Sequence, residues 1–218
     1  MKGITHAPLE APGKISSRIR QQNQQRILAA AEVEFAQHGF NSARMGAIAQ
    51  ATGLPKANLH YYFKTKKSLY QTLLSTGLDA WKCHASTLQV TQSPSLALSQ
   101  YIQHKVHFAR QNPHTSRLLA MELLTGGAHL DSHQQQVFQH WIDHLTHTFD
   151  AWSQAGTLRA LDPRTLIIAL WGSTLYYTDF PPLNPASPRP TKQTDMQLSQ
   201  QLAELILHGC MPTHCPPI

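Results

Sequence analysis

The segment from Phe40 to Tyr70 predicts two short helices joined by a tight turn, with a longer helix beginning directly after them. Apolar residues recur at helical spacing in the first short helix, at Met45, Ile48 and Ala49. Gly53 would end that helix, because glycine adopts the left-handed conformation that closes many helices. Pro55 suits the first turn of the next helix, where its missing N–H group is no loss. The pattern predicts a helix-turn-helix.

The second helix of this pair would present a polar and aromatic face to the outside. Leu59 and Phe63 are four residues apart and would share the inner face. The other faces carry Lys56, Ala57, Asn58, His60 and Tyr61. A helix that enters the major groove of DNA needs such an outer face, with side chains that reach base edges.

At these residues the chain resembles the DNA-binding domain of the TetR family of bacterial regulators. The resemblance spans roughly residues 20–75 and rests on Gly39-Phe40, Ile48-Ala49, Gly53, Leu59-His60-Tyr61-Tyr62-Phe63, Lys66 and Leu69. It implies a double-stranded DNA operator as partner, contacted by Arg44, Lys56, Asn58, His60, Tyr61, Tyr62 and Lys66. Core packing is the alternative for His60 and Tyr61. The family's usual threonine is replaced by Ala43, so we expect Asn41 or Ser42 to cap the first short helix.

Basic residues are concentrated in the N-terminal third of the chain. Residues 1–67 hold ten Lys and Arg against three acidic residues, a net charge of +7. The remainder holds eight basic and nine acidic residues, a net charge of −1, which leaves the chain's total at +6. One-sided basicity of this kind favours binding to a polyanion such as DNA. A generic basic tail, residues 2–20, is the alternative.

The rest of the chain predicts an all-α fold, because no segment has a convincing strand pattern. We expect a disordered basic arm over residues 1–16 and a three-helix helix-turn-helix DNA-binding domain over residues 17–66. Residues 67–218 would form a helical ligand-binding and dimerisation domain. Its helices are expected to begin near residues 67, 94, 114, 131, 163 and 194 and to end near residues 81, 112, 124, 154, 179 and 208.

Two helices near the C-terminus predict a dimer interface. The first is apolar nearly all round, at Leu166, Ile167, Leu170 and Trp171, so it must be buried on several sides. Together with the last helix it could supply half of a four-helix interface, although packing within one chain is the alternative. A helix-turn-helix that binds a palindrome works as a pair, with recognition helices about 34–36 Å apart or a multiple of that.

Composition indicates the compartment. Three cysteines provide no disulfide framework, and the N-terminal residues lack the apolar stretch of a signal peptide. The longest apolar run, residues 166–171, is too short to span a bilayer. We therefore expect a soluble cytoplasmic protein with no membrane partner.

The C-terminal residues resemble the branch of the TetR family that regulates pyrimidine utilisation. The shared pattern includes Tyr101-Ile102, Ser116-Arg117-Leu118, Met121-Glu122, Trp171, Ser173-Thr174 and Tyr177. This resemblance implies a small-molecule effector, a free pyrimidine base in that branch, whose binding releases DNA. It implies ligand contacts from Trp81, Trp171, Leu175 and Tyr176, although ordinary core packing is the alternative for the aromatic residues. Where that branch has an amide, this chain has Leu175, so we expect a small aromatic or heterocyclic effector with a less polar edge.

Fourteen histidines raise the possibility of a metal. On one predicted helix they fall near one face, at His133, His140, His144 and His147, and a second group is His208, Cys210, His214 and Cys215. A metal-dependent helical hydrolase is therefore the alternative function. No nucleophile elbow, phosphate loop or HExxH motif supports it, so we expect no catalytic residues, no metal site and no cofactor. A third possibility is a DNA-binding protein that responds to a protein partner.

Overall fold

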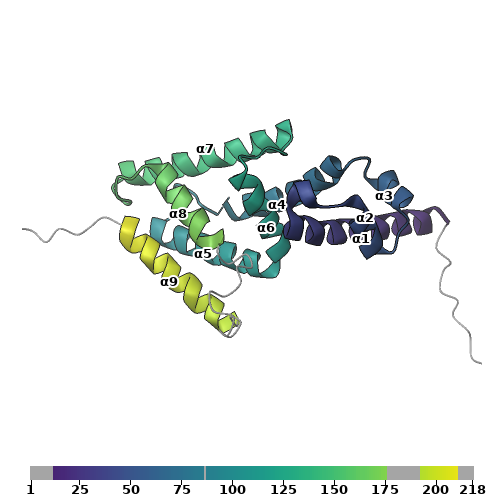
Figure 1. The fold of residues 1–218 in the computed structure, drawn as a ribbon. Coiled ribbons are helices and arrows are strands. Elements are labelled where there is room, and N and C mark those ends of the chain that lie inside the picture. Colours follow the sequence, from purple (N-terminus) through teal and green to yellow (C-terminus); the bar gives the residue numbers. More distant parts are fainter. Residues whose placement is uncertain (1–11, 86, 176–191, 211–218) are drawn as a thin grey trace, which may run out of the picture. The chain divides into compact units, whose positions relative to one another are not determined.

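The computed structural model describes residues 12–85, 87–175 and 192–210 (Figure 1). Within these ranges the chain forms nine α-helices and no strand, which confirms the expected all-α class. The helices are α1 (Pro12–Ser42), α2 (Met45–Thr52), α3 (Lys56–Tyr62), α4 (Lys66–Ala85), α5 (Pro94–Gln111), α6 (Pro113–Leu124), α7 (Ser132–Gln154), α8 (Pro163–Leu175) and α9 (Lys192–Cys210). None of the helices in the described ranges has both the length and the apolar character that a membrane crossing requires.

The chain divides into two compact units between Tyr70 and Gln71. This division falls four residues after the expected boundary at Lys66, inside α4, whose first turn belongs to the first unit. Helix α1 begins at Pro12, so residues 12–16 of the expected disordered arm are helical. Residues 1–11 lie outside the described residues.

The core of the first unit is built on one stripe of α1. Ile27, Ala31 and Phe35 recur every four residues and are buried, as the sequence pattern predicts. The Phe35 ring meets Tyr70 of α4 edge-on, with ring centroids 4.8 Å apart. Buried Ile48 of α2 and Leu59 of α3 complete this core, so the three-helix arrangement follows from the apolar spacing.

Two helix ends shape the helix-turn-helix. Gly39 interrupts the helical backbone of α1 with a φ of +70°. Gly53 ends α2, as predicted, with a φ of +66°, and its N–H group donates to the Gln50 carbonyl over 3.1 Å. The expected cap of α2 is wrong: Arg44 precedes the helix without a side-chain bond, because Asn41 and Ser42 still belong to α1.

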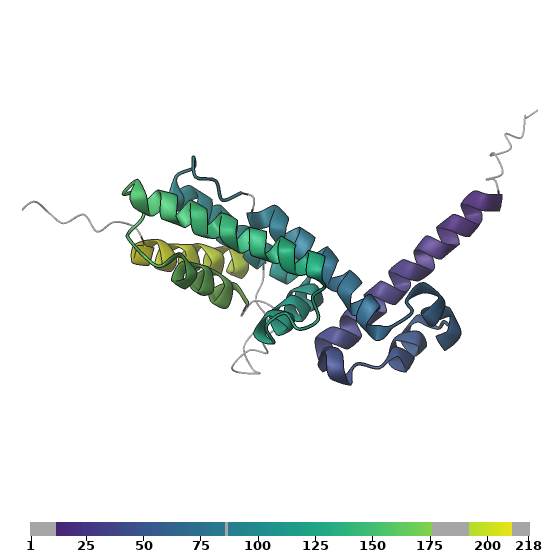
Figure 2. The same ribbon diagram turned by 90° about the horizontal axis from the view of Figure 1, so that it is seen from above.

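The second unit is a helical bundle arranged around α5. Helix α5 packs against α6, α8 and α9, and α7 packs against α8. Figures 1 and 2 show α8 and α9 side by side. The starts of α5, α6, α7, α8 and α9 fall within two residues of those expected from the sequence. The described part of α8 ends at Leu175, and the expected continuation over residues 176–179 lies outside the described residues.

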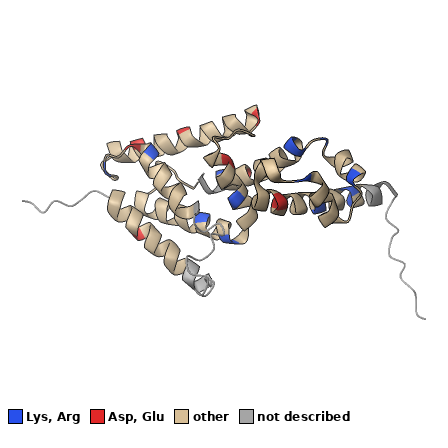
Figure 3. Ribbon diagram, in the orientation of Figure 1, with Lys and Arg blue, Asp and Glu red and all other residues tan. Residues whose placement is uncertain are grey.

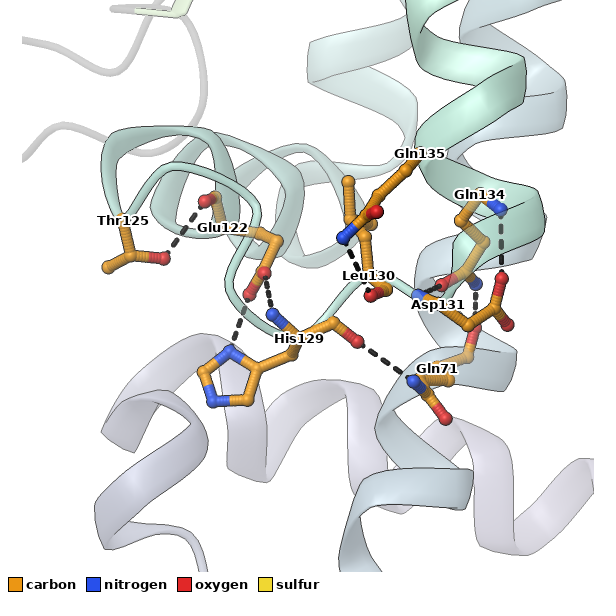
Figure 4. Close-up of polar contacts among 8 residues, drawn as sticks. All are labelled: Gln71, Glu122, Thr125, His129, Leu130, Asp131, Gln134 and Gln135. Atoms are coloured by element: carbon orange, nitrogen blue, oxygen red, sulfur yellow. Dashed lines mark hydrogen bonds and ion pairs between the residues drawn. The ribbon is translucent and has the colours of Figure 1, made fainter.

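Polar contacts fasten the connection between α6 and α7 to α4 (Figure 4). The buried carboxylate of Glu122 accepts the backbone N–H group of His129 over 2.6 Å and lies 3.0 Å from its ring Nδ1. The carboxamide of Gln71 on α4 donates to the His129 carbonyl over 2.9 Å. In return, Gln134 on α7 donates to the Gln71 carbonyl over 2.7 Å. A capping box between Asp131 and Gln134 fixes the start of α7.

Candidate DNA-binding surface and effector site

Helix α3 presents the predicted outer face. Leu59 is fully buried and Phe63, directly after the helix, is 6% exposed, so both lie in the core as predicted. The residues predicted to contact DNA on this helix that lie at the surface are Lys56, Asn58, His60 and Tyr61. Tyr61 is 70% exposed, so an aromatic side chain lies at the surface of this helix. This arrangement can offer donors, acceptors and an aromatic surface to a groove.

The aromatic pair on α3 is supported by α1. Tyr62 is half-buried, and its hydroxyl accepts a hydrogen bond of 3.3 Å from the carboxamide of Asn23. The Tyr61 ring stands edge-on to the Tyr62 ring, with centroids 5.3 Å apart. The Arg20 guanidinium lies 5.9 Å from the Tyr61 ring centroid, so α1 adds a cation to the same surface. The sequence analysis missed Arg20 and Asn23, because only the folded chain brings α1 beside α3.

Arg44 and Lys66 lie at the ends of neighbouring helices. Arg44 is exposed at the start of α2, and its backbone N–H group donates to the Glu34 carboxylate over 2.9 Å. The Lys66 ammonium donates to the carbonyls of Asn41 and Ala43, each over 3.1 Å, and lies 4.8 Å from the Phe40 ring centroid. Lys66 therefore fastens the start of α4 to the end of α1. Two of its three N–H groups are used in this way, and its contact with phosphate stays a prediction.

Among the charged residues of the first unit, Lys and Arg outnumber Asp and Glu (Figure 3). The acidic residues among its described positions are Glu32 and Glu34, both on α1. Glu34 is engaged by the backbone of Arg44 and lies 3.8 Å from the His38 ring. The exposed lysines of this unit, Lys56, Lys64 and Lys67, lie on or next to α3. The charge is thus placed where the helix-turn-helix would meet a polyanion.

An aromatic cluster lies inside the second unit. It brings the predicted Trp81 of α4 and Trp171 of α8 together, with ring centroids 6.4 Å apart. Trp141 of α7 stacks on Trp171 at 4.8 Å and meets Trp81 at 5.8 Å, and Phe138 lies 5.7 Å from both Trp141 and Trp171. Trp81 is buried and Trp171 is half-buried. The side chain of Leu175 at the end of α8, and the whole of Tyr176, lie outside what the structure describes.

Helix α5 adds two polar groups to this aromatic cluster. The Trp171 indole N–H group donates to the fully buried Tyr101 hydroxyl over 3.1 Å, and burial raises the pKa of that hydroxyl. One turn later, the Lys105 ammonium lies 3.4 Å from the Trp81 ring centroid. Lys105 is 4% exposed, and burial lowers the pKa of its ammonium to about 7. The sequence analysis missed Lys105, although its spacing from buried Leu98 and Tyr101 on α5 is a detectable signal.

Comparison with known proteins agrees with this geometry. Residues 27–73 match the family described as bacterial regulatory proteins, tetR family. Residues 74–213, more than half of the chain, match the family described as YcdC-like protein, C-terminal region. The chain belongs to the TetR family of bacterial regulatory proteins. It is therefore a DNA-binding transcriptional regulator and not an enzyme, as expected from the sequence.

One similar TetR-family relative is the HTH-type transcriptional regulator RutR of Escherichia coli strain K12. It is 32% identical over 212 residues, which cover 96% of this chain and all of RutR. RutR of Shigella flexneri matches to the same extent. RutR is a regulator of pyrimidine utilisation, so the predicted resemblance to that branch of the TetR family is confirmed.

Solved structures of TetR-family regulators share the fold. AibR in complex with isovaleryl coenzyme A and operator DNA has a TM-score of 0.67 at 21% identity, and the match covers 84% of this chain and 97% of AibR. The ketosteroid regulator KstR2 of Mycobacterium tuberculosis has a TM-score of 0.69 at 17% identity, covering 87% and 95% of the two chains. At these identities the likeness concerns the fold alone.

The TetR-family assignment leaves the alternative of a metal-dependent hydrolase without support. On α7 the ring of His144 lies 2.9 Å from the Leu88 carbonyl, and that of His140 lies 2.9 Å from the Gln136 carbonyl. Across the described residues, no group of three His, Cys, Asp or Glu side chains could hold a metal ion. His214 and Cys215 of the second predicted cluster lie outside those residues.

Proposed function

We propose that this TetR-family protein is a homodimeric repressor that binds a palindromic operator and is released by a small aromatic or heterocyclic effector. The observation that carries the DNA-binding part is the exposed face of α3. Four predicted contact residues, Lys56, Asn58, His60 and Tyr61, lie at the surface of a helix whose Leu59 is fully buried. A surface of this composition has no role in the core and fits a major groove.

The predicted contacts divide into base-reading and positioning groups. Lys56, Asn58 and His60 belong to the first group, because their side chains can pair with base edges. Arg44, Tyr62 and Lys66 belong to the second group, with Tyr61, since they flank the reading positions and can meet phosphate or sugar. The Arg20 guanidinium beside Tyr61 adds a cation to the positioning group.

A homodimer through α8 and α9 is supported by exposed apolar residues on these helices. Ile168 of α8 is 69% exposed, and Met196 and Leu205 of α9 are 74% and 73% exposed. Leu166, Ile167 and Leu170 of α8 are buried within the chain, so α8 packs inward and still presents an apolar outer side. On that outer side Ala169 and Gly172 are exposed and small, which lets a second helix approach closely. Two copies would present two α3 helices to one palindrome.

The aromatic cluster is the site that we assign to the effector. Trp81 and Trp171 would stack on a flat molecule, and the family resemblance adds Leu175 and Tyr176 as expected contacts. AibR shows that a protein of this fold is found with both a small molecule and operator DNA. We expect the regulator to act in the cytoplasm, where its DNA lies.

The test is a binding titration of the purified protein on its own upstream DNA, with fluorescence anisotropy at several salt concentrations. We expect specific binding, with a logarithmic salt dependence that reflects phosphate contacts. A variant with Lys56, Asn58 and His60 all replaced by Ala serves as the folded control and should lose the preference for this DNA over random DNA. Equal binding to both DNAs by the natural protein would contradict the proposal.

A further inference from the structure

Lys105 is a buried cation that has no anionic partner among the residues that the structure describes. Its side chain is 4% exposed, and within the described residues its ammonium forms neither a hydrogen bond nor an ion pair. The contact that it does make is with the Trp81 ring, 3.4 Å from the centroid. A charge held inside a protein without a counter-ion is costly, so such groups are normally paired.

None of the acidic side chains that the structure describes on the neighbouring helices supplies the missing partner, and the side chain of Asp195 on α9 lies outside what is described. Helices α5 and α8 contain no Asp or Glu. Asp79 of α4, Asp143 and Asp150 of α7 and Glu204 of α9 are all exposed to solvent. Glu122 of α6 is buried, and its carboxylate is bound to the backbone and ring of His129. Burial is accordingly the cause that lowers the pKa of the Lys105 ammonium.

The indole N–H groups of the aromatic cluster show the same imbalance. Four buried side-chain polar atoms in the described residues lack a hydrogen-bond partner, and two of them are the indole nitrogens of Trp81 and Trp141. The third indole of the cluster, Trp171, donates to the Tyr101 hydroxyl. Trp81, Trp141 and Lys105 all carry hydrogen-bond donors, and no acceptor in the described part of the chain pairs with them. Native proteins leave few buried donors unpaired, so this concentration points to an absent acceptor.

We propose that the effector is a planar aromatic or heteroaromatic anion whose negative group pairs with Lys105. The inference rests on the proposed function, since it assigns a charge to the effector of that same site. The half-buried ring of Trp171, which lies beside the buried rings of Trp81 and Trp141, provides stacking area for the planar part of the molecule. The unpaired N–H groups of Trp81 and Trp141 are available to further acceptors on its rim. A carboxylate and an ionised ring oxygen would both meet this requirement.

The effector would thus have one edge of low polarity and one negatively charged edge. By sequence, position 175, one turn after Trp171, is a leucine where the pyrimidine-utilisation branch is expected to have an amide, so no amide is available there to pair with a polar edge of the effector. Lys105 on α5 requires a negative edge. A neutral pyrimidine base satisfies neither requirement, whereas an aromatic acid can satisfy both. Charge-assisted hydrogen bonds are about twice as strong as neutral ones, so an acid should be strongly preferred to its neutral counterpart.

The experiment compares acids with their neutral isosteres. Benzoate, naphthalene-2-carboxylate and indole-3-carboxylate are titrated against the corresponding carboxamides, with indole fluorescence and calorimetry as readouts. A second pair, barbiturate and uracil, tests an ionised ring in place of a carboxylate. The proteins are the natural chain, Lys105→Met and the control Lys82→Met. Lys82 directly follows Trp81 but is exposed, so its removal changes the net charge equally without touching the aromatic cluster.

We expect at least one acid to bind the natural protein about 30-fold more tightly than its neutral isostere. The preference should vanish in Lys105→Met and persist in Lys82→Met. An acid preference that survives in Lys105→Met would overturn the proposal, as would equal binding of acids and neutral isosteres, or no binding by any acid. The comparison within the natural protein needs no variant, so it remains decisive if Lys105→Met does not fold.

DNA binding is measured separately on the same samples. An acid that binds through Lys105 but does not release the upstream DNA would contradict the proposed effector response and leave the anion site standing. Release of the DNA by neutral molecules that bind independently of Lys105 would support the proposed effector response and contradict the anion site. The two proposals therefore fail in distinguishable ways.

Discussion

The ammonium of Lys66 donates a 3.1 Å hydrogen bond to the backbone carbonyl of Ala43. It donates another of the same length to Asn41, so one side chain holds the start of α4 to the end of α1. The carbonyls are free to accept because α1 ends at Ser42, beyond which no helical N–H group reaches them. A residue expected from its family resemblance to meet phosphate is thus also a structural clamp within the first unit.

Replacing Lys66 with Ala should therefore have two effects. Loss of two charge-assisted bonds should destabilise the first unit by about 1–3 kcal/mol, which thermal unfolding would show. If Lys66 also meets phosphate, the slope of log affinity against log salt should flatten by about one unit for every DNA sequence. Lys67→Ala, an exposed neighbour, is the control for net charge. A destabilised variant with an unchanged salt slope would limit Lys66 to the structural role.

Lys56→Ala tests base reading by α3. Lys56 is exposed at the first position of the helix, and a good bidentate contact to a base is worth about 1–3 kcal/mol of discrimination. We expect selection on random DNA to return a motif that is relaxed at one position of each half-site and unchanged elsewhere. Lys64→Ala lies just beyond the helix and should weaken all sequences alike. The same motif at full stringency from Lys56→Ala would mean that Lys56 does not read a base.

Charge placed on the outer side of α8 and α9 should separate the protomers. Ile168→Asp and Leu205→Asp each replace an exposed apolar side chain in the proposed interface, where a buried unpaired carboxylate is costly. We expect both variants to sediment as monomers and to bind palindromic DNA at least about tenfold more weakly. Leu124→Asp on α6 is the control, because Leu124 is 82% exposed and lies outside the proposed interface. Dimers that persist in both variants would place the interface elsewhere.

The sequence predicted features that depend on near neighbours in the chain. The end of α2 at Gly53 and the inward positions of Leu59 and Phe63 follow from backbone preference and helical period, which local sequence encodes. The cap of α2 was assigned wrongly, because helical backbone continues past Gly39 to Ser42 and carries Asn41 and Ser42 with it. In this segment the Phe40 ring packs against Phe35 and Tyr70, a tertiary contact that composition near the cap does not reveal.

At the effector site, too, the sequence did not predict contacts between residues that are distant in the chain. Trp81 and Trp171 could be paired through a family resemblance, and the structure brings them within 6.4 Å. The contact between Lys105 and Trp81 could not be predicted from the sequence, because it joins two different helices, α5 and α4. Lysine is normally exposed, so its burial becomes visible only when α4, α5, α7 and α8 are assembled.

Lys105 should make the stability of the effector-free protein depend on pH. Burial lowers the pKa of its ammonium from 10.5 to about 7, so between these values the unfolded chain binds more protons than the folded one. The free energy of unfolding should therefore rise with pH from pH 7 to pH 9, by about 2 kcal/mol relative to Lys105→Met. Below pH 7 the two proteins should show parallel curves. Subtracting the variant removes other groups that titrate here, including the buried Cys210 thiol, whose pKa is raised by burial. Parallel curves throughout would contradict a buried ammonium.

Uracil should not release this protein from its operator, and Leu175→Gln should gain that response. The reason lies in the sequence: Leu175 stands one turn after Trp171, where the resembling branch has an amide that can pair with a base edge. Losing such a partner in a dry site costs about 1–3 kcal/mol, or roughly one to two orders of magnitude in affinity. The measurement is operator release titrated with uracil and thymine on both proteins, with Leu175→Met as the apolar control. Micromolar release of the natural protein by uracil would refute the assignment. A response gained by Leu175→Gln and absent from Leu175→Met would show that position 175 selects the edge of the effector.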